Sequence, residues 1–320
     1  MSVGAGRRAV AIGGGTGLPG VLRCLVELGF ETTAVVTMAD DGGSSGMLRR
    51  QLGMLPPGDV RNCIAALADD DEALLTRLFQ YRFPHGEGLA GHALGNLILA
   101  ALADLTGSFP AAISAVEGYL HTHGRVLPST LADVELHGVD RAGAVLSGQA
   151  RLAGNPEPLS CVRLEPADPP AYPPALAAIR EADVIVIGPG SLYTSLIPIL
   201  LVSDFADAVR ASHATRIYVC NVANMRGETG GFDAADHVAA LAEHGLDRAI
   251  DVVLVHEQAS PSERLCDDGA AVEVVSVSAD IRDRIEAHGP RVVSADFVDP
   301  ADPVRHSRVA LCRALERVVS

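Results

Sequence analysis

A glycine-rich turn at residues 13–20 is the part of this sequence that most directly suggests chemistry. It follows a short apolar stretch and precedes an amphipathic helical pattern. Because glycine has no side chain, its backbone amides approach a ligand closely, and the positive end of the following helix attracts the same anionic group. The turn is therefore expected to bind a phosphate. Gly15, Gly17 and Gly20 also have the spacing of a dinucleotide-binding fingerprint, which alone does not identify the ligand.

The basic residues narrow the mechanisms that such a turn can serve. All 25 of them are arginine, and the chain contains no lysine. A Walker-type phosphate loop needs a lysine on the terminal phosphates, and Schiff-base or pyridoxal phosphate chemistry needs a lysine amine. The sequence therefore excludes a Walker-type ATPase and lysine-dependent covalent catalysis.

Two adjacent carboxylates, Asp40 and Asp41, begin a second glycine- and serine-rich loop at the end of the second expected strand. Asp40 stands near the position of the acid that binds ribose hydroxyls in dinucleotide-binding folds. Alternatively, one of the two carboxylates could hold Mg²⁺ between diphosphate oxygens together with Asp59. A capped turn without a ligand is the third interpretation, because Asp, Gly and Ser are common in turns. All three stay open at this point.

Two further segments place polar residues at the starts of helices. Asp59 is expected to cap a helix, and Asn62 lies on its first turn, where an anion would be favoured. His92 and Asn96 belong to a similar polar segment, in which His92 would bond a phosphate or sugar hydroxyl or serve as a structural histidine. The hydroxyls of the second loop complete this set of candidate sugar or phosphate ligands: Thr37, Ser44 and Ser45.

The loop after the third strand repeats the physical features of the first turn, with a glycine turn, hydroxyl side chains and a helix start. A second phosphate cradle facing the first would suit a diphosphate-linked ligand, and a capped turn is the alternative. The fourth strand leads into Asn221 and then into a Gly-Glu-Thr-Gly segment. The candidate binding residues of these two loops are Gly188, Pro189, Gly190, Ser191, Thr194, Ser195, Asn221, Glu228 and Thr229.

The elements that must position these loops follow an alternating strand and helix pattern. Continuous Val and Ile runs indicate strands buried on both faces of a parallel sheet, whose ligand crevice lies beyond the carboxyl ends of the strands. We expect an α/β fold, a doubly wound, Rossmann-like and mostly parallel sheet in a single domain over residues 1–320. Residues 127–174 alternate and are rich in Pro and Gly, which predicts a small antiparallel and loop insertion or lid. The expected strands are residues 8–12, 32–37, 183–187, 216–220, 251–255, 272–275 and 291–293, and the expected helices are near residues 59–67, 72–79, 94–105, 110–120 and 303–319.

Composition bounds the partners and the compartment. A net charge of -15, a pI near 5.1, the absence of Trp and an aromatic content of 4% argue against nucleic-acid binding. The six cysteines form no CxxC pair and are expected to be reduced, mostly buried thiols. No run approaches the roughly 18 apolar residues of a membrane span. The sequence therefore predicts a cytoplasmic protein that binds neither nucleic acid nor membrane.

Several of these motifs, taken in order, resemble the YvcK-type gluconeogenesis factors of the CofD-like superfamily, which includes the 2-phospho-L-lactate transferases. The resemblance covers nearly the whole chain. His237 lies in one of the matching segments, although it lacks a third ligand at metal-binding spacing. The segments that carry the resemblance are residues 13–18, 40–46, 56–59, 91–97, 188–195, 218–221, 227–229 and 236–238.

The resemblance implies a Rossmann-like core and a regulatory factor for cell shape on gluconeogenic carbon sources that binds UDP-N-acetylglucosamine or a related UDP-sugar. It further implies that Asp41 and Asp59 match the metal-holding carboxylates of the transferases, with Mg²⁺ as the candidate ion. The Gly-Asp-Arg-Asp segment of the transferases is not found in this sequence. The nucleotide or diphosphate would be held by Gly14, Gly15, Thr16, Gly17, Asn221 and the loop that begins at Gly188.

Three hypotheses follow, and they differ in what the glycine turn does. In the first, the chain is a nucleotide-sugar-binding regulatory protein without turnover that forms homo-oligomers and acts on a protein partner that the sequence does not identify. In the second, it is a Mg²⁺-dependent transferase that uses Asp41 and Asp59. In the third, Gly15, Gly17, Gly20 and Asp40 serve a nicotinamide oxidoreductase. The order of the residues alone does not assemble a Ser/His/Asp triad, so hydrolase chemistry lacks support.

Overall fold

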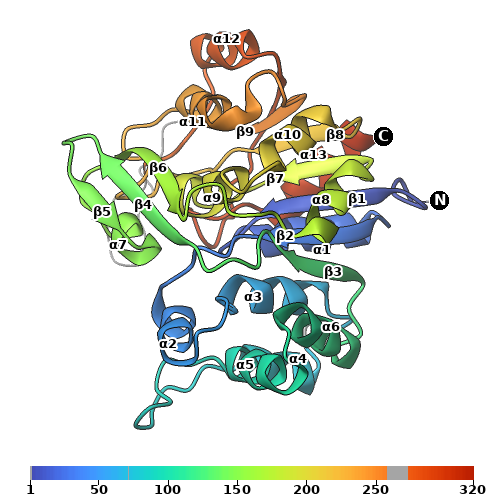
Figure 1. Ribbon diagram of the computed structural model, residues 1–320. Helices are drawn as coiled ribbons and strands as arrows, with labels where there is room; N and C mark the ends of the chain where they lie inside the picture. The colour runs from blue at the N-terminus through green and yellow to red at the C-terminus, as the bar shows by residue number, and fades with distance from the viewer. Residues whose placement is uncertain (1, 71, 258–272) are drawn as a thin grey trace.

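A seven-stranded parallel sheet forms the centre of the molecule, as the computed structural model shows for residues 2–70, 72–257 and 273–320 (Figure 1). Its strand order is β10-β9-β8-β7-β1-β2-β3. The chain therefore runs from β1 toward one edge through β2 and β3, and from β7 toward the other edge through β8, β9 and β10. The strands are β1 (Arg8–Gly13), β2 (Glu31–Val36), β3 (Gly124–Pro128), β7 (Val184–Ile187), β8 (Thr215–Val219), β9 (Val252–His256) and β10 (Arg291–Ala295).

The Val- and Ile-rich composition of the central strands explains their position. All four residues of β7, all five of β9 and the last five of β1 are buried, which requires helices on both faces of the sheet. In register, Ile12 of β1 lies between Val35 of β2 and Ile187 of β7, so these three strands end together. The doubly wound parallel sheet predicted from the sequence is confirmed.

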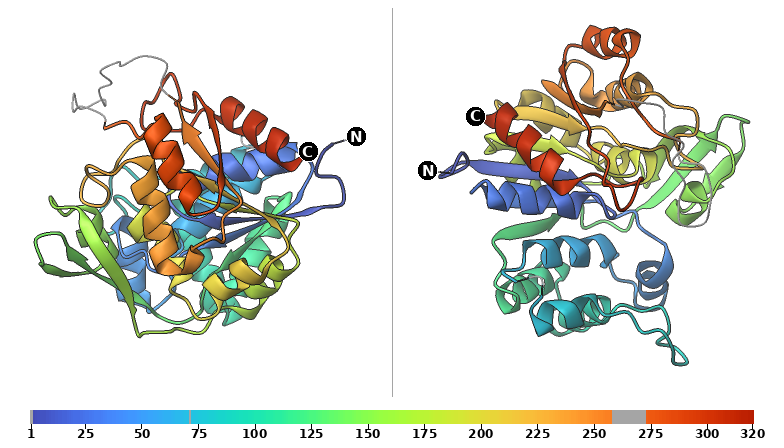
Figure 2. Two further views of the ribbon diagram at one scale, coloured as in Figure 1. Left: turned by 90° about the horizontal axis from the view of Figure 1, so that it is seen from above. Right: turned by 180° about the vertical axis from the view of Figure 1, so that it is seen from behind.

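Helices cover the sheet on both faces. The helix α1 packs between α3 and α13 on one face, whereas α8 packs against α10 on the other, and Figure 2 shows α1 and α13 together in the view from behind. The helices are α1 (Leu18–Glu27), α2 (Gly43–Leu52), α3 (Gly58–Leu67), α4 (Leu74–Gln80), α5 (Leu94–Thr106), α6 (Phe109–Tyr119), α7 (Gln149–Ala153), α8 (Pro173–Arg180), α9 (Ile197–Leu200), α10 (Phe205–Ala211), α11 (Ala234–Leu241), α12 (Ala279–Ala287) and α13 (Arg308–Val319), with π-helical turns at Leu192–Leu196 and Ala242–Leu246.

Within the described residues, no single helix is long and apolar enough to cross a membrane. One pair of helical segments is long and apolar enough only when its two parts are combined, and a 77° bend separates them: Leu192–Leu200 and Phe205–Ala211. Both segments contribute to the buried core between the main sheet and its covering helices.

The insertion expected at residues 127–174 contains a three-stranded antiparallel sheet of order β5-β4-β6. Its elements are β4 (Glu135–Asp140), β5 (Val145–Ser147) and β6 (Leu159–Glu165), with α7 between β5 and β6. The first two residues assigned to the insertion belong instead to β3, which pairs with β2 at the edge of the main sheet. That strand was missed because Gly124–Pro128 is short and contains both Gly and Pro.

Two other expected elements differ from the structure. The helix predicted over residues 303–319 begins only at Arg308, because residues 303–307 form a turn and a bridge in which Val298 pairs with His306. The strand predicted at 272–275 is reduced to one bridge between Val274 and Ala223, and its first residue lies outside the described part of the chain.

The cysteines correct a further expectation. Cys24 on α1 and Cys312 on α13 form a disulfide, with their Cα atoms 5.1 Å apart. The two residues are 288 positions apart, so their spacing does not indicate a pair, and only the packing of α1 against α13 brings them together. Cys266 lies outside the described residues, and the free thiols are Cys63, Cys161 and Cys220, of which Cys161 is exposed.

Candidate functional site

The loops that follow β1, β7 and β8 meet around a cavity of about 700 Å³. These three strands are neighbours in the sheet, and β1 and β7 flank the point where the strand order reverses. Open parallel sheets bind ligands at this point. The cavity is lined by Gly15, Thr16, Gly17, Pro19, Gly20, Arg23, Asn62, Gln80, Pro189, Gly190, Ser191, Asn221, Val222, Ala223, Asn224, Met225, Arg226, Asp302, Val304, Arg305, His306, Arg308 and Leu311.

The first turn packs so closely against its neighbours that side chains are excluded at two positions. A Cβ atom on Gly17 would lie 2.7 Å from the carbonyl oxygen of Pro189. A Cβ atom on Gly14 would lie 2.3 Å from Oδ2 of Asp59. The glycines therefore serve two purposes, because they keep the amides open to a ligand and let the turn contact the loop after β7.

Asn221 fixes the loop after β7. Its Nδ2 donates to the carbonyl oxygen of Gly190 at 2.9 Å, and its Oδ1 accepts from the amide of Gly190 at 3.2 Å. Both hydrogen bonds to one backbone residue hold Gly190 at the cavity wall, where a Cβ atom would lie 3.3 Å from the carbonyl oxygen of Gly14. Asn221 thus joins the third and fourth loops and also lines the cavity.

Glu228 and Thr194 bond each other inside the protein. The side chain of Glu228 is fully buried, accepts from Thr194 Oγ1 at 2.7 Å and accepts from the amide of Tyr193 at 3.2 Å. Burial raises the pKa of Glu228, opposed by these hydrogen bonds. Ser195 is buried in the same turn, and Thr229 Oγ1 accepts from the amide of Met225 at 3.1 Å. The structure therefore places Glu228, Thr194 and Thr229 among the supports of the third and fourth loops.

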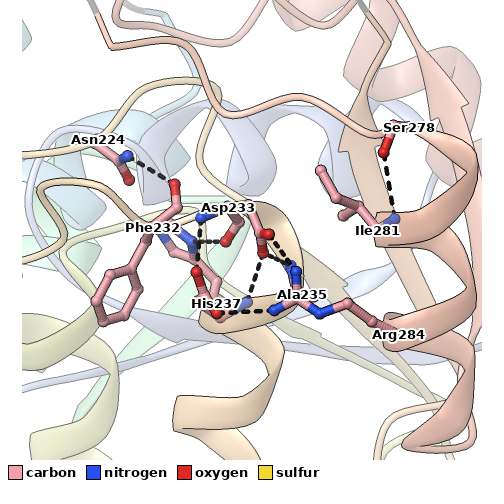
Figure 3. A network of polar contacts seen from close by, with 9 residues as sticks. Asn224, Phe232, Asp233, Ala235, His237, Ser278, Ile281 and Arg284 are labelled. Atoms are coloured by element: carbon pink, nitrogen blue, oxygen red, sulfur yellow. Dashed lines mark hydrogen bonds and ion pairs between the residues drawn. The ribbon is translucent and has the colours of Figure 1, made fainter.

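The start of α11 anchors the fourth loop (Figure 3). Asn224 lines the cavity and donates through Nδ2 to the carbonyl oxygen of Phe232 at 2.8 Å. Asp233 caps α11 and forms an ion pair with Arg284 of α12. The ring of His237 is fully buried beneath this cap, with Nδ1 bonded to the carbonyl oxygen of Asp233 at 2.9 Å. Burial lowers the pKa of His237, which supports α11 and is absent from the described cavity lining.

One wall of the cavity was missed in the sequence. Residues 302–311 reach it from the end of the chain, and they bring Arg305 and Arg308 to the lining beside Arg23 and Arg226. His306 holds this segment in place, because its Nε2 donates to the carbonyl oxygen of Cys220 at 2.9 Å, and burial lowers its pKa to about 4. The neutral ring can therefore donate from one nitrogen at ordinary pH.

We call the segment 302–311, which contains Arg305 and Arg308, the arginine wall. No local motif predicts it, because contacts between residues far apart in the sequence bring it to the cavity. The disulfide that joins α1 to α13 is one such contact, and the hydrogen bond from His306 to the end of β8 is another. The one available signal was the clustering of arginines near the last helix. Both arginines of this segment also have carboxylate partners, since Arg305 pairs with Asp302 and Arg308 pairs with Glu27.

The second loop lies beside the first turn, and its carboxylates are occupied by backbone amides. Asp40 accepts from the amide of Gly42 at 3.0 Å. Asp59 accepts from the amide of Gly15 at 2.8 Å, so it supports the first turn and does not cap α3 as predicted. Burial raises the pKa of Asp59 to about 7, with a further contribution from the negative charge of Asp40. Burial likewise raises the pKa of Asp40.

A network of buried polar side chains links the second loop to α3 and α5. Ser44 Oγ lies 3.0 Å from His92 Nδ1 and accepts from Asn96 Nδ2 at 2.9 Å. Arg61 continues the network, since it donates to Asn96 Oδ1 at 3.4 Å and to Asn62 Oδ1 at 2.7 Å. Burial lowers the pKa of Arg61 to about 10. Asn62 is the member of this network that also lines the cavity.

Three other predicted residues have local partners. Thr37 Oγ1 accepts from the amide of Ala39 at 3.3 Å, and Ser45 Oγ accepts from the amide of Gly58 at 3.1 Å. Ser191 lies at the cavity, with its Oγ 3.1 Å from Met225 Sδ.

The carboxylates bear directly on the predicted metal site. Asp41 is bonded to another part of the chain, since its Oδ1 accepts from the amide of Ala150 at the start of α7 at 2.8 Å. Asp40 is the carboxylate whose charge acts on Asp59. The part of the chain that the structure describes contains no group of three or more His, Cys, Asp or Glu side chains arranged to hold a metal ion. Two carboxylates next to a phosphate cradle nevertheless fit Mg²⁺, which takes one or two carboxylates with phosphate and water.

Comparisons with known proteins agree with this architecture. A family model described as 2-phospho-L-lactate transferase CofD matches residues 9–298. A putative gluconeogenesis factor of Nostoc sp. is 48% identical over 97% of this chain and 68% of its own length. The gluconeogenesis factor of Halalkalibacterium halodurans is 41% identical, over 97% of this chain and 95% of its own. A crystal structure of a UPF0052 family protein from Bacillus halodurans is 40% identical, with a TM-score of 0.88 over 96% of this chain and 99% of that chain. The chain therefore belongs to the CofD family, among its gluconeogenesis factors.

Proposed function

We propose that this protein is a regulatory factor that binds a UDP-sugar, UDP-N-acetylglucosamine or a close relative, in the cavity between the first turn and the arginine wall. Its role would be cytoplasmic and linked to gluconeogenesis and cell shape, as expected from the resemblance. The observation that carries the proposal is the cavity at the strand-order reversal, which combines two glycine turns with four arginines.

The lining of the cavity suits a nucleoside diphosphate joined to a sugar. The amides of the turns after β1 and β7 offer donors to phosphate oxygens, and the arginines add charge and bidentate donors for the same groups. Asn221 and Asn224 supply amide groups that can pair with a sugar or a base. A volume of about 700 Å³ lies in the range of pockets that enclose small molecules and cofactors.

A binding role without turnover is supported by the state of the polar side chains near the cavity. Glu228 is fully bonded inside the protein, and His237 is buried beneath α11. His306 donates to a backbone carbonyl and has a pKa of about 4, so its ring is neutral at ordinary pH. These groups are bound to support the loops, which leaves them poorly placed to act as a general base.

The second candidate is a Mg²⁺-dependent transferase resembling the 2-phospho-L-lactate transferases. It is favoured by one observation, the placement of Asp40 and Asp59 behind Gly15, where a metal could bridge to a diphosphate. Mg²⁺ bound there would neutralise developing charge on phosphate oxygens. Asp40 and Asp59 would hold it, in place of the predicted Asp41 and Asp59.

Titration calorimetry with UDP-N-acetylglucosamine tests the binding proposal, with NAD as the matched control for the oxidoreductase hypothesis. We expect saturable heat with the UDP-sugar and none with NAD. Absence of saturation at millimolar UDP-sugar would reject the proposal, and saturable binding of NAD alone would favour the oxidoreductase.

A product assay tests the transferase candidate separately. The protein is incubated with nucleotide-activated phospholactate, a deazaflavin acceptor and Mg²⁺. Product that requires Mg²⁺ and is lost in Asp59→Ala supports catalysis, whereas binding of the UDP-sugar without any product supports the regulatory role.

A further inference from the structure

The disulfide between Cys24 of α1 and Cys312 of α13 lies next to residues that line the cavity. Arg23 and Leu311, the chain neighbours of the two cysteines, both belong to the lining. We propose that this disulfide is a redox switch that sets the affinity of the cavity for its ligand, because reduction removes the covalent bond between α13 and α1. The inference concerns regulation of the site and rests on the proposed function for the identity of the ligand.

A disulfide is unexpected in the compartment that the proposed function assigns to the protein. Disulfides are rare in the cytoplasm, where thiol buffers keep cysteines reduced, and those that form there are typically transient and redox-sensing. Within the described residues, the pair of Cys24 and Cys312 is the one disulfide, and the three other cysteines are free thiols. This combination indicates a bond that forms and breaks.

The two sulfur atoms of the disulfide differ in their access to solvent. Cys24 is fully buried, whereas Cys312 is half-buried and lines a surface cavity of about 190 Å³ between the end of α1 and α13. Thiol–disulfide exchange begins when a thiolate attacks a sulfur atom that it can reach. An external dithiol therefore attacks Sγ of Cys312, and Cys24 is the leaving thiolate.

The exchange reaction balances between the protein and the dithiol. Attack on Cys312 breaks its bond to Cys24 and forms a mixed disulfide between Cys312 and one sulfur of the dithiol. The second sulfur of the dithiol then displaces Cys312, so the dithiol is oxidised to a disulfide. The protein gains two electrons and the two protons that the dithiol loses, one proton on each cysteine sulfur. The oxidised form of the dithiol reverses the same steps.

Each thiol of the reduced pair has a hydrogen-bond acceptor already in place. Sγ of Cys24 lies 3.6 Å from the carbonyl oxygen of Arg308, and Sγ of Cys312 lies 3.7 Å from Oε2 of Glu27. A thiol is a weak donor that can use both of these acceptors. Reduction therefore leaves neither thiol without a partner, and both redox states are compatible with the fold.

The remaining contacts of the arginine wall decide what reduction changes. Arg308 forms an ion pair with Glu27 of α1, but both side chains are 52% exposed, and exposed ion pairs contribute little to stability. His306 donates to the carbonyl oxygen of Cys220, which attaches the wall to the end of β8. Reduction should therefore loosen the wall where it meets α1, beside Arg23, and leave its attachment to β8 in place.

Titration calorimetry with UDP-N-acetylglucosamine tests the switch in oxidised protein and in protein reduced with dithiothreitol. We expect the reduced protein to bind about tenfold more weakly, which corresponds to the loss of about one charged hydrogen bond to phosphate. Cys24→Ser combined with Cys312→Ser should bind like the reduced protein, with or without dithiothreitol. A double variant that binds like the oxidised protein would overturn the inference.

Cys161→Ser is the matched control, because Cys161 is an exposed free thiol outside the disulfide. It should keep the full response to dithiothreitol. Loss of the response in Cys161→Ser would assign the redox effect to that thiol and would overturn the role of the disulfide. Circular dichroism should be unchanged by reduction, because Leu311, Ala314 and Leu315 keep α13 packed in the core.

Amide hydrogen exchange tests the structural step without any ligand. Reduction should increase deuterium uptake in residues 302–311 and leave it unchanged in α8 on the other face of the sheet. Equal uptake in residues 302–311 in both redox states would overturn the inference. Increased uptake together with no binding of the UDP-sugar in either state would reject the proposed function and still support a redox-dependent wall.

Thermodynamic linkage provides a third test. If oxidation raises the affinity tenfold, then saturating UDP-sugar must favour the disulfide by the same factor. For a two-electron couple this factor lowers the reduction potential of the disulfide by about 30 mV. The potential is measured by equilibrating the protein in mixtures of reduced and oxidised dithiothreitol, alkylating the free thiols and weighing the products by mass spectrometry. A potential that is the same with and without bound UDP-sugar would overturn the inference.

Discussion

The turn after β1 and the loop after β2 have similar compositions but different surroundings. Both are rich in glycine and contain hydroxyl residues, Thr16 in the first turn and Ser44 and Ser45 in the second loop, and both follow buried parallel strands. The first turn contributes Gly15, Thr16 and Gly17 to the cavity, whereas Asp40, Ser44 and Ser45 of the second loop bond other groups of the protein. The difference follows from the sheet, because β1 lies at the reversal of strand order and β2 lies one strand farther away.

The second loop therefore supports the first turn through hydrogen bonds within the protein. Asp59 accepts from the amide of Gly15, Ser45 accepts from the amide of Gly58, and Gly58 begins the helix that carries Asp59. A ligand would meet the first turn directly, and the second loop would fix the shape of that turn. The two regions should therefore respond differently to substitution.

The largest expected effect is on the first turn. Gly17→Val places a branched side chain where even a Cβ atom would lie 2.7 Å from the carbonyl oxygen of Pro189. The two loops must separate, so affinity for the UDP-sugar should fall by at least about 100-fold, or about 3 kcal/mol. Calorimetry measures the affinity, and circular dichroism confirms folding. Gly118→Val is the control, because a Cβ atom on Gly118 of α6 meets no atom within 4 Å. Retained affinity in Gly17→Val would move the site elsewhere.

The next largest effect is on stability and involves Asp59, which links the second loop to the first turn through its hydrogen bond to Gly15. Its pKa is raised to about 7 in the folded protein from an ordinary value of 3.8. The folded state therefore binds a proton that the unfolded state has lost, and stability should fall as pH rises from about 4 to about 7. Asp59→Asn keeps an oxygen for the Gly15 amide and removes the charge. At pH 8 this variant should be more stable by a few kcal/mol.

Urea unfolding at pH 4 and pH 8 checks the Asp59 prediction. The variant and the unmodified protein should unfold at similar urea concentrations at pH 4 and should differ at pH 8. Adding Mg²⁺ at pH 8 sharpens the result, because an ion held by Asp40 and Asp59 would stabilise the unmodified protein and leave Asp59→Asn unchanged. An equal stability difference at both pH values would mean that the carboxylate is charged throughout this range.

Sequence reasoning found the first turn and the third loop because both follow continuous apolar strands, whose carboxyl ends define the crevice of a parallel sheet. It also identified Asp59, as a helix cap and as a candidate metal ligand, but it did not predict the hydrogen bond to Gly15, which spans 44 residues. The wall that contains Arg305 and Arg308 was missed for a related reason. Its position depends on α13 packing against α1, which no local pattern encodes.

A smaller effect is expected at Asn221, which supports the cavity from the third and fourth loops. Asn221→Ala removes both hydrogen bonds to Gly190 and leaves that backbone residue free to shift. Affinity for the UDP-sugar should fall by about tenfold, or about 1.4 kcal/mol, within the range for losing hydrogen bonds at a partly buried site. Calorimetry measures the change. An affinity equal to that of the unmodified protein would show that the ligand does not depend on the position of Gly190.

The smallest effect on binding is expected in the buried network of the second loop. Ser44→Ala removes the hydroxyl that accepts from Asn96 and contacts His92, so two buried partners lose a hydrogen bond. The free energy of unfolding should fall by about 1–3 kcal/mol, the cost of leaving buried polar groups unsatisfied. Affinity for the UDP-sugar should change by less than about threefold, or about 0.6 kcal/mol, because Ser44 acts behind the first turn. Urea unfolding and calorimetry measure the two quantities on one preparation. A large loss of affinity with unchanged stability would place the Ser44 hydroxyl on the ligand and would remove the distinction between the two loops.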